Sequence, residues 1–337
     1  MTDNNLHFDE LYNLIVKADD GNSKAMNTLH NYYCLEKYTQ DDFKIEFIEL
    51  LTERANQNKP YSLLQLSLIY LLGLGVERDF DKCTELLIKS INVNCSCAYY
   101  VMAMLVLADQ IEYAMDYDEL LSKAMDLGNS AAFIQKGVEC SETDFEQSLE
   151  LYKKAIDMDN DYAIYKLGEL YHDNNKYKLA IEYYNQAINK NVHHAHFNLA
   201  VMYREGEGVD IDLDKAKKLF KEAMSLGNIK AITCIGGLYE QCNNLKKAKK
   251  YYKMAIVEDD TFAKYNLGLI YETEKKYKKA IKCLIESAKD GHQSSGHQLI
   301  YDYNVTNLDM TDSEIDELLN FHYAFKDFGA YDGFLSR

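Results

Sequence analysis

The stretch from residue 163 to 195 contains a pattern that recurs along almost the whole chain. Its first half, Ala-x-x-x-Leu-Gly-x-x-Tyr, places an alanine, a leucine and a tyrosine on one face of a helix, with a glycine beside the leucine. Its second half spreads tyrosine, alanine and isoleucine over a broad apolar face of a second helix. A single pair of helices leaves part of this apolar surface exposed to water. The pattern therefore predicts helix pairs that stack on their neighbours.

The small residue that opens each unit recurs about once every 31 to 37 residues, which marks about nine units. The units from the fifth to the eighth are the most regular, and the first and fourth are the least. In three of the four most regular units a glycine follows the central leucine or isoleucine, at Gly168, Gly236 and Gly268, and the sixth unit has Ala200 there. We expect the two helices of a pair to approach closely there and to leave no room for a branched side chain. The opening residues are Ala25, Ser62, Ala98, Ala132, Ala163, Ala195, Ala231, Ala263 and Ser295.

The second and sixth units carry an insert between their two helices. It reads Gly-Leu-Gly-Val at residues 73–76 and Gly-Glu-Gly-Val at residues 206–209, and Leu-Gly-Asn at residues 226–228 closes the sixth unit. This run resembles Sel1-like repeats, and the shorter units resemble tetratricopeptide repeats, over roughly residues 7 to 305. The resemblance implies an all-α, right-handed α-solenoid of about nine Sel1/TPR-like helix pairs. It also implies a scaffold or adaptor for protein–protein interaction rather than a catalyst.

We expect a helix to cap each end of the repeats, because an unpaired end unit would expose apolar surface. The predicted divisions are an N-terminal capping helix at residues 1–21, the Sel1/TPR-like solenoid at 22–305, and a C-terminal capping helix and tail at 306–337. The first ten residues contain no apolar run, and no stretch reaches the roughly 18 apolar residues of a membrane span. These features favour a soluble, cytoplasmic protein that does not bind membranes.

The cysteines follow no common spacing, and most of them fall on the apolar face of a predicted helix. We therefore expect free buried thiols rather than a disulfide framework. They are Cys34, Cys83, Cys95, Cys97, Cys140, Cys234, Cys242 and Cys283.

Charge is distributed unevenly along the chain. Residues 1–150 hold 26 acidic and 11 basic residues, a net charge of −15, whereas residues 246–289 hold 12 lysines and 6 acidic residues, a net charge of +6. The lysines fall on the solvent side of the second helices, so we expect a solvated outer face. A nucleic acid partner is not expected, because the whole chain has a net charge of −17 and contains few arginines.

No stretch of the sequence carries a recognisable catalytic motif. The histidine cluster at His193, His194 and His196 does not place three ligands on one helix face, and we expect ordinary turn or groove histidines there. The Gly-x-Gly-Val inserts lack the Lys-Ser/Thr ending and the preceding strand of a phosphate-binding loop, so they predict turns. We expect no enzyme activity, no metal and no cofactor.

One column of residues, three positions after each opening residue, predicts a binding surface. Five of its nine members are carboxamides, which both donate and accept hydrogen bonds and can pair with the backbone of an extended peptide. Aromatic residues on adjoining columns would supply anchoring pockets. The column consists of Thr28, Gln65, Val101, Gln135, Lys166, Asn198, Cys234, Asn266 and Gln298.

We therefore expect the concave face of the first helices to bind a peptide or a partner protein. Two alternatives remain open: the column is polar only because it faces water, or the chain is a structural subunit of an assembly that uses its ends and its convex face. The candidate groove residues are Gln135, Tyr162, Tyr165, Lys166, His194, Phe197, Asn198, Phe262, Tyr265, Asn266 and Gln298.

Overall fold

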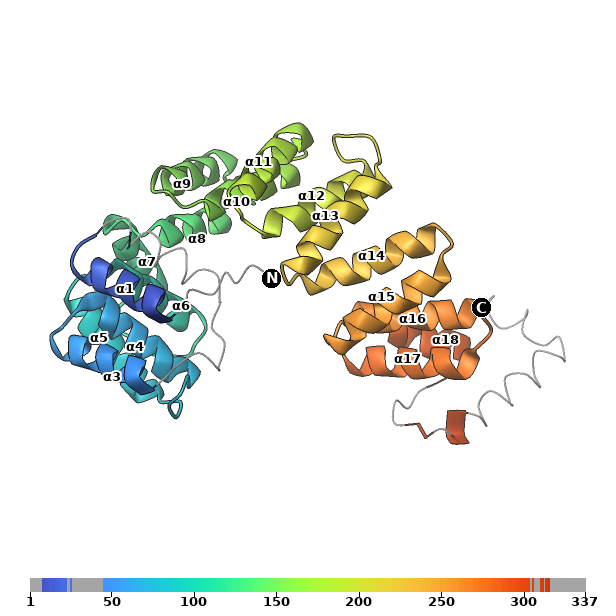
Figure 1. The fold of residues 1–337 in the computed structure, drawn as a ribbon, viewed down its shortest axis with the longest axis horizontal. Coiled ribbons are helices and arrows are strands. Elements are labelled where there is room, and N and C mark those ends of the chain that lie inside the picture. Colours follow the sequence, from blue (N-terminus) through green and yellow to red (C-terminus); the bar gives the residue numbers. More distant parts are fainter. Residues whose placement is uncertain are drawn as a thin grey trace. The chain divides into compact units, whose positions relative to one another are not determined.

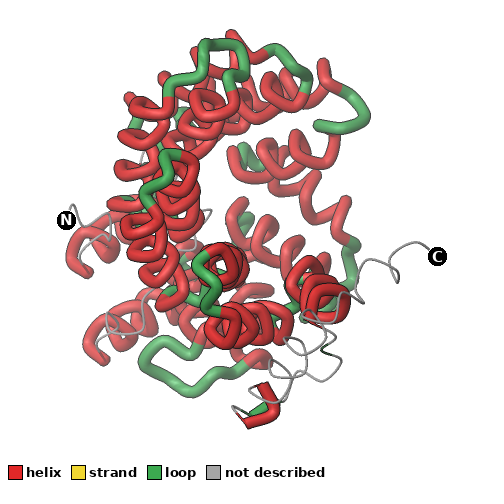
Figure 2. The backbone as a smooth tube through the Cα atoms, turned by 90° about the vertical axis from the view of Figure 1, so that its right-hand side faces the viewer, coloured by secondary structure: helices red, strands yellow, loops and turns green. Residues whose placement is uncertain are grey.

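The computed structural model describes residues 8–22, 25, 45–303, 305, 310–311 and 313–315. All regular secondary structure in these residues is helical, and they include no strand (Figures 1 and 2). The helices follow one another as repeated pairs, so the predicted all-α solenoid is confirmed. Thr28, Cys34 and nearly all of the predicted C-terminal capping helix and tail lie outside the described residues.

The chain divides into two compact units, residues 1–195 and 196–337. We call the first helix of each pair the A helix and the second the B helix. The first unit contains α1 (Phe8–Asp19), α3 (Ile45–Asn56) and the pairs α4 (Pro60–Leu72) with α5 (Phe80–Asn92), α6 (Ser96–Leu107) with α7 (Tyr117–Asp126), α8 (Ser130–Cys140) with α9 (Phe145–Asp157), and α10 (Tyr162–Asp173) with α11 (Tyr177–Asn189).

The second unit continues the same alternation. Its helices are α12 (His194–Glu205), which begins at the end of the first unit, α13 (Leu213–Ser225), α14 (Ile229–Gln241), α15 (Leu245–Val257), α16 (Thr261–Thr273), α17 (Tyr277–Lys289) and α18 (Gln293–Tyr303).

Short polar residues fix the helix starts. Asp144 caps α9 by accepting a hydrogen bond from the Gln147 N–H at 2.9 Å, and Asp260 caps α16 by accepting one from the Ala263 N–H at 2.9 Å. Each cap satisfies a backbone donor that the first turn of a helix leaves unpaired. Asparagine, with its tolerance of positive φ, turns the chain after several helices, as Asn175 does at a φ of 56°. Local sequence thus sets the helix boundaries.

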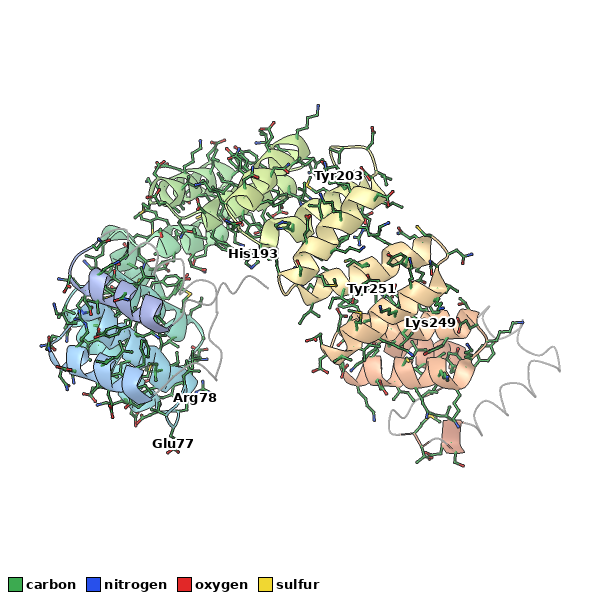
Figure 3. The ribbon with its side chains drawn as sticks, in the orientation of Figure 1. Glu77, Arg78, His193, Tyr203, Lys249 and Tyr251 are labelled. Carbon is green, nitrogen blue, oxygen red and sulfur yellow. The ribbon has the colours of Figure 1, made fainter. Side chains whose placement is uncertain are left out.

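Glycines build the two predicted inserts as turns. Gly206 and Gly208 have φ values of 77° and 74°, a region that glycine enters at little cost. The insert closes when the Asp212 N–H donates to the Tyr203 carbonyl at 2.8 Å, and the first insert closes in the same way between Asp79 and Tyr70 at 3.0 Å. Figure 3 shows Glu77 and Arg78 directly after the first insert and Tyr203 just before the second. The prediction of turns is confirmed.

The core consists of the small residues that open each unit and the large residues that surround them. Ala163, Ala195, Ala231 and Ala263 are fully buried, with no measurable exposure. Tyr184 has only 1% of its surface exposed and fills space on the B-helix side of its pair. Small A-helix residues buried beside a large B-helix side chain, such as Tyr184, therefore recur in the core.

The predicted packing glycines meet their partners at different distances. A Cβ atom built on Gly168 would lie 2.6 Å from the Tyr184 ring, and one built on Gly236 would lie 2.5 Å from the Tyr252 ring. Both glycines are therefore confirmed as close-packing positions. Gly268 leaves more room, because a leucine, Leu284, takes the place of the tyrosine and its nearest atom is 3.2 Å away.

The irregular fourth unit contains the same contact, although its sequence does not follow the pattern. A Cβ atom on Gly137 would lie 2.6 Å from the Tyr152 ring. The pairing of glycine with tyrosine therefore extends to a unit in which the sequence pattern is degraded.

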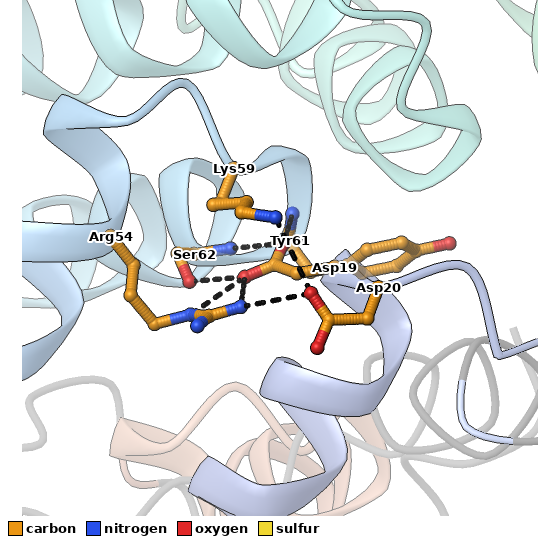
Figure 4. A network of polar contacts seen from close by, with 6 residues as sticks. All are labelled: Asp19, Asp20, Arg54, Lys59, Tyr61 and Ser62. Carbon is orange, nitrogen blue, oxygen red and sulfur yellow. Dashed lines mark hydrogen bonds and ion pairs between the residues drawn. The ribbon is translucent and has the colours of Figure 1, made fainter.

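Helix α1 packs against α4 and supplies the cap that α4 lacks (Figure 4). The fully buried carboxylate of Asp19 accepts hydrogen bonds from the Tyr61 N–H at 2.8 Å and from the Ser62 hydroxyl at 2.6 Å. Arg54 of α3 donates to the same carboxylate at 3.1 Å. This charged network ties α1, α3 and α4 together at the start of the first complete pair.

The described cysteines are free thiols. Four of them are buried, which confirms that part of the prediction, but Cys242 is exposed because it follows the last residue of α14. The buried ones are Cys83, Cys95, Cys97 and Cys140. Within the described part of the chain, no helix combines the length and the apolarity that a membrane crossing needs.

Candidate functional site

The A helices of the second unit form a cleft of about 660 Å³ along α12, α14 and α16. It includes four of the residue positions that the sequence placed near the groove: Phe197, Cys234, Phe262 and Asn266. It is lined by Phe197 and Arg204 of α12, by Ile229, Lys230, Thr233, Cys234 and Gly237 of α14, by Glu258, Asp259 and Asp260 of the turn after α15, and by Thr261, Phe262 and Asn266 of α16.

Apolar side chains form the two sides of the cleft. Phe262 has 65% of its surface exposed and Ile229 has 40%, which is unusual for large apolar residues. Phe197 is partly buried and packs edge-on against Phe220, with ring centroids 5.5 Å apart. Helix α14 contributes Ile229 at its start and the small side chains of Thr233 and Cys234 further along. An apolar ligand side chain would remove the exposed surfaces from water.

Arg204 lies at the α12 side of the cleft and is held by neighbouring groups. Its Nε donates to Glu205 at 2.5 Å, and its Nη1 approaches the Cys234 sulfur at 3.6 Å. Burial raises the pKa of the Cys234 thiol, and the nearby guanidinium opposes that rise only in part. Cys234 is therefore a neutral thiol at neutral pH and contributes volume rather than a charge.

Hydrogen bonds between A helices hold the opposite side of the cleft. The Thr233 hydroxyl of α14 donates to Asp260 at 2.9 Å, and the same carboxylate caps α16. Lys230 and Glu258 are exposed, and neither side chain makes a hydrogen bond or an ion pair to other described residues. They supply one free cation and one free anion to the cleft.

The predicted amide column does not form a uniform ladder. Asn266 is partly buried, lines the cleft and makes no side-chain hydrogen bond to the described residues, so its amide oxygen and nitrogen are available to a ligand. Asn198 is partly buried on α12, whereas Gln298 donates to Glu272 at 2.8 Å and Gln135 donates to Glu139 at 3.5 Å. Among the carboxamides of the column, Asn266 is therefore the one that combines a place in the cleft with an unpaired side chain.

Gln65 departs furthest from the predicted column. It is fully buried in α4, and neither its amide oxygen nor its amide nitrogen has a hydrogen-bond partner among the described residues. A buried residue cannot meet a ligand, so its proposed place in the ladder is wrong. The reason is that the face of α4 that carries Gln65 is covered by the surrounding structure.

Two aromatic clusters occur at equivalent places. In the second unit the centroid of the His292 ring lies 5.0 Å from that of Phe262 and 4.6 Å from that of Tyr265. In the first unit the centroid of the His194 ring lies 5.4 Å from the ring centroids of both Tyr162 and Tyr165. Each cluster joins the start of one A helix to the start of the next. The sequence analysis missed His292, and no shared spacing could have found it, because His194 directly precedes the opening residue Ala195 whereas His292 lies three residues before the opening residue Ser295.

Lys166 is already engaged within the first unit. Its ammonium lies 2.7 Å from Glu169 and within 5.6 Å of the centres of the Tyr162 and Tyr165 rings. Burial acts to lower the pKa of Lys166, but the attraction of Glu169 outweighs it and the pKa is raised. The Tyr165 hydroxyl also donates to Glu169 at 2.5 Å, and burial followed by this carboxylate raises the tyrosine pKa. The predicted groove residues here form a closed polar cluster.

The histidine cluster does not assemble a metal centre. The described residues contain no group of three or more His, Cys, Asp or Glu side chains that could hold a metal ion.

Comparison with known proteins supports the repeat architecture. A model of the Sel1 repeat matches residues 60–94, 121–160, 193–228 and 236–256, and a model of the tetratricopeptide repeat matches residues 161–189 and 263–289. No curated protein sequence matches the chain significantly.

Solved structures share the fold at low sequence identity. The protective antigen c5321 of uropathogenic Escherichia coli, which displays an SLR fold, aligns with a TM-score of 0.53 at 20% identity over 84% of this chain and 65% of its own. A Sel1 repeat protein from Oxalobacter formigenes aligns with a TM-score of 0.52 at 21% identity, over 73% of this chain and 96% of its own. Yeast Tom70 aligns with a TM-score of 0.51 at 18% identity, over 94% of this chain and 61% of its own. The chain thus spans less than two thirds of the antigen and of Tom70.

Proposed function

We propose that this chain, which belongs to the Sel1-like repeat proteins with tetratricopeptide-like units, is a non-catalytic adaptor that binds an extended peptide of a partner protein in the cleft of its second unit. Proteins built from these repeats generally mediate protein–protein interactions. The observation that carries the proposal is a cleft of about 660 Å³ that combines an exposed Phe262 with an unpaired Asn266.

The chemistry of the cleft supports a peptide with one large apolar anchor. Phe262 and Ile229 offer exposed apolar area, and the volume falls in the range of about 300 to 1,000 Å³ typical of ligand pockets. Asn266 can donate to a peptide carbonyl and accept from a peptide N–H, because its own side chain is unpaired. Recognition would come from the apolar anchor, while the amide fixes the backbone.

A random peptide library displayed on phage and selected against the full chain tests this proposal. The selected peptides, labelled with a fluorophore, should bind with lower affinity to the Asn198→Ala, Asn266→Ala double variant, by about 1 to 3 kcal/mol. Phe262→Ala should weaken binding by at least about 1 kcal/mol through loss of apolar contact. Melting temperature should change little for Phe262→Ala, because that side chain is 65% exposed.

Matched controls use residues of the same chemistry away from the cleft. Gln147→Ala removes an exposed amide from α9, and Ile211→Ala removes a side chain that is 64% exposed in the second insert. Both should bind the selected peptides with unchanged affinity. A library that gives no binders, or peptides that bind the cleft variants as tightly as the parent chain, would refute the groove. Binding confined to folded proteins would favour the structural-subunit alternative.

A further inference from the structure

Helices α9 and α15 occupy the same place in their repeats. Both are B helices of 13 residues, and they begin at residues 145 and 245. Their buried tyrosines correspond, with Tyr152 at 2% and Tyr252 at 1% exposure, and each packs on the glycine of its A helix. Residue numbers that differ by 100 therefore mark equivalent positions in the two helices.

The solvent faces of these equivalent helices carry opposite charges. The carboxylate stripe of α9 consists of Glu146 and Glu150, and the lysine stripe of α15 consists of Lys246 and Lys250. All four side chains are exposed. Residues four apart lie on the same helix face, so each stripe presents two like charges at the same spacing.

Helix stability does not explain the lysine stripe. Cations near a helix N-terminus are disfavoured by the helix dipole, whereas the acids of α9 are favoured there. No described carboxylate bonds Lys246 or Lys250, although Lys249 between them pairs with Glu274 of the next repeat. Figure 3 shows Lys249 and Tyr251 on this helix. Solubility does not require the stripe either, since the chain has a net charge of −17.

The carboxylate stripe borders a shallow hollow on α9. The hollow has a volume of about 480 Å³, and its lining combines three carboxylates with one amide, one apolar side chain and one lysine. Glu150 also pairs with Lys154 at 2.8 Å, which leaves Glu146 as the freer carboxylate. The lining residues are Asp144, Glu146, Gln147, Leu149, Glu150 and Lys153.

We infer that the lysine stripe of one copy docks on the carboxylate stripe of a second copy of this chain. Charge complementarity indicates a second copy as the partner, because residues 1–150 carry a net charge of −15 and residues 246–289 carry +6. Apolar contact adds to the pairing, because Met254 and Val257 at the other end of α15 are 39% and 79% exposed. The two lysines lie at the start of α15, at the other end of the helix from Glu258, which lines the peptide cleft.

The two docking surfaces differ, so the contact is heterologous. Each copy carries one lysine stripe and one carboxylate stripe, and association can therefore continue into a ring or an open chain. Charge pairing at exposed sites weakens with salt, because the screening length falls from about 10 Å at 0.1 M to about 3 Å at 1 M.

Sedimentation velocity of the full chain tests this inference. The average mass should rise with protein concentration at about 0.1 M salt and fall toward the monomer at about 1 M salt. Lys246→Glu with Lys250→Glu should raise the apparent dissociation constant at least about tenfold, and Glu146→Lys with Glu150→Lys should do the same. An equimolar mixture of these two variants should associate again, because each surface then meets its opposite charge.

Controls separate docking from folding and from net charge. Lys218→Glu with Lys221→Glu makes the same charge change on α13 and should leave association unchanged. The Lys246→Gln, Lys250→Gln variant removes both charges, and α15 should stay folded because glutamine favours helices. It should therefore weaken association even if the change of both lysines to glutamate unfolds α15. A parent chain that stays monomeric at low salt, variants that associate like the parent, or a mixture that stays monomeric would each overturn the inference.

Discussion

Gly236 and Gly237 are neighbours in α14, yet a methyl group added to each would meet different surroundings. A Cβ atom on Gly236 would lie 2.5 Å from the Tyr252 ring, whereas one on Gly237 would meet only the Tyr252 hydroxyl at 3.7 Å. The ring cannot easily move, because Tyr252 is 1% exposed and its hydroxyl donates to Glu240 at 2.7 Å. The two substitutions to alanine should therefore have opposite effects.

The expected magnitudes follow from two opposing terms. Replacing glycine by alanine inside a helix stabilises it by about 1 kcal/mol, and overpacking a core costs about 1 to 3 kcal/mol. Gly237→Ala should stabilise the chain by most of the ~1 kcal/mol that alanine gains over glycine inside a helix, because the new methyl group meets little resistance. The added Cβ atom would lie 2.5 Å from a buried ring, so the overpacking cost should fall in the upper part of its range, about 2 to 3 kcal/mol, and Gly236→Ala should lose about 1 to 2 kcal/mol after the two terms are combined. The branched Gly236→Val should lose about 2 to 3 kcal/mol or more.

Thermal and urea unfolding followed by circular dichroism measures this difference. The midpoint should fall for Gly236→Ala and rise for Gly237→Ala, and Gly268→Ala should lie near the parent chain because its nearest atom, in Leu284, is 3.2 Å from the new Cβ. Tyr252→Leu in the Gly236→Ala background should destabilise less than the separate effects add up to. Equal midpoints for the two alanine variants would refute the assigned contact.

Three further outcomes are expected. Gln65→Leu should stabilise the chain by about 1 to 3 kcal/mol, because it removes a buried amide without partners; a lower melting temperature would contradict this. Hydrogen bonds from two lysines hold the pKa of Glu274 at about 2, below its ordinary value. A lowered carboxyl pKa stabilises the fold at neutral pH and loses that contribution as pH falls toward about 2. The difference in melting temperature between the parent chain and Glu274→Gln should therefore narrow in acid, and a constant difference would exclude the pairing. Iodoacetamide should label the exposed Cys242 first, while Cys83, whose pKa burial raises to about 11, should react only after unfolding, as peptide mass spectrometry can show.

The repeat architecture was predictable because its signal is local. Ala163 and Gly168 lie five residues apart on one helix, and their small size allows another helix to pack closely there. This can be read from the sequence without knowing which residue the partner helix contributes. The partner itself is a distant residue and is not set by the spacing. Tyrosine faces Gly168, but leucine faces Gly268, and this exchange changes the space around the glycine. The predicted equivalence of these glycines was therefore only partly confirmed.

The candidate site was less predictable, because the environment of each column residue depends on its neighbours. Asn266 and Gln298 occupy the same place in successive repeats, but a carboxylate, Glu272, lies beside Gln298 and binds its amide. Gln65 shares the column and is buried. Periodicity identifies the face of a helix, and the neighbouring helices decide whether that face is free, paired or covered.

The cleft and the charged stripes share a physical origin in the division between core and surface. The core requirements of a repeat are met by its opening alanine and by the contact between glycine and tyrosine, so other positions can vary without loss of the fold. At the cleft, α14 places Thr233, Cys234 and Gly237 between larger residues of α12 and α16, and their small side chains leave the volume open. On the B helices the same freedom allowed a glutamate and a lysine at equivalent exposed positions. Departures from the repeat pattern at exposed positions are therefore where binding surfaces are to be sought, since the fold does not require them.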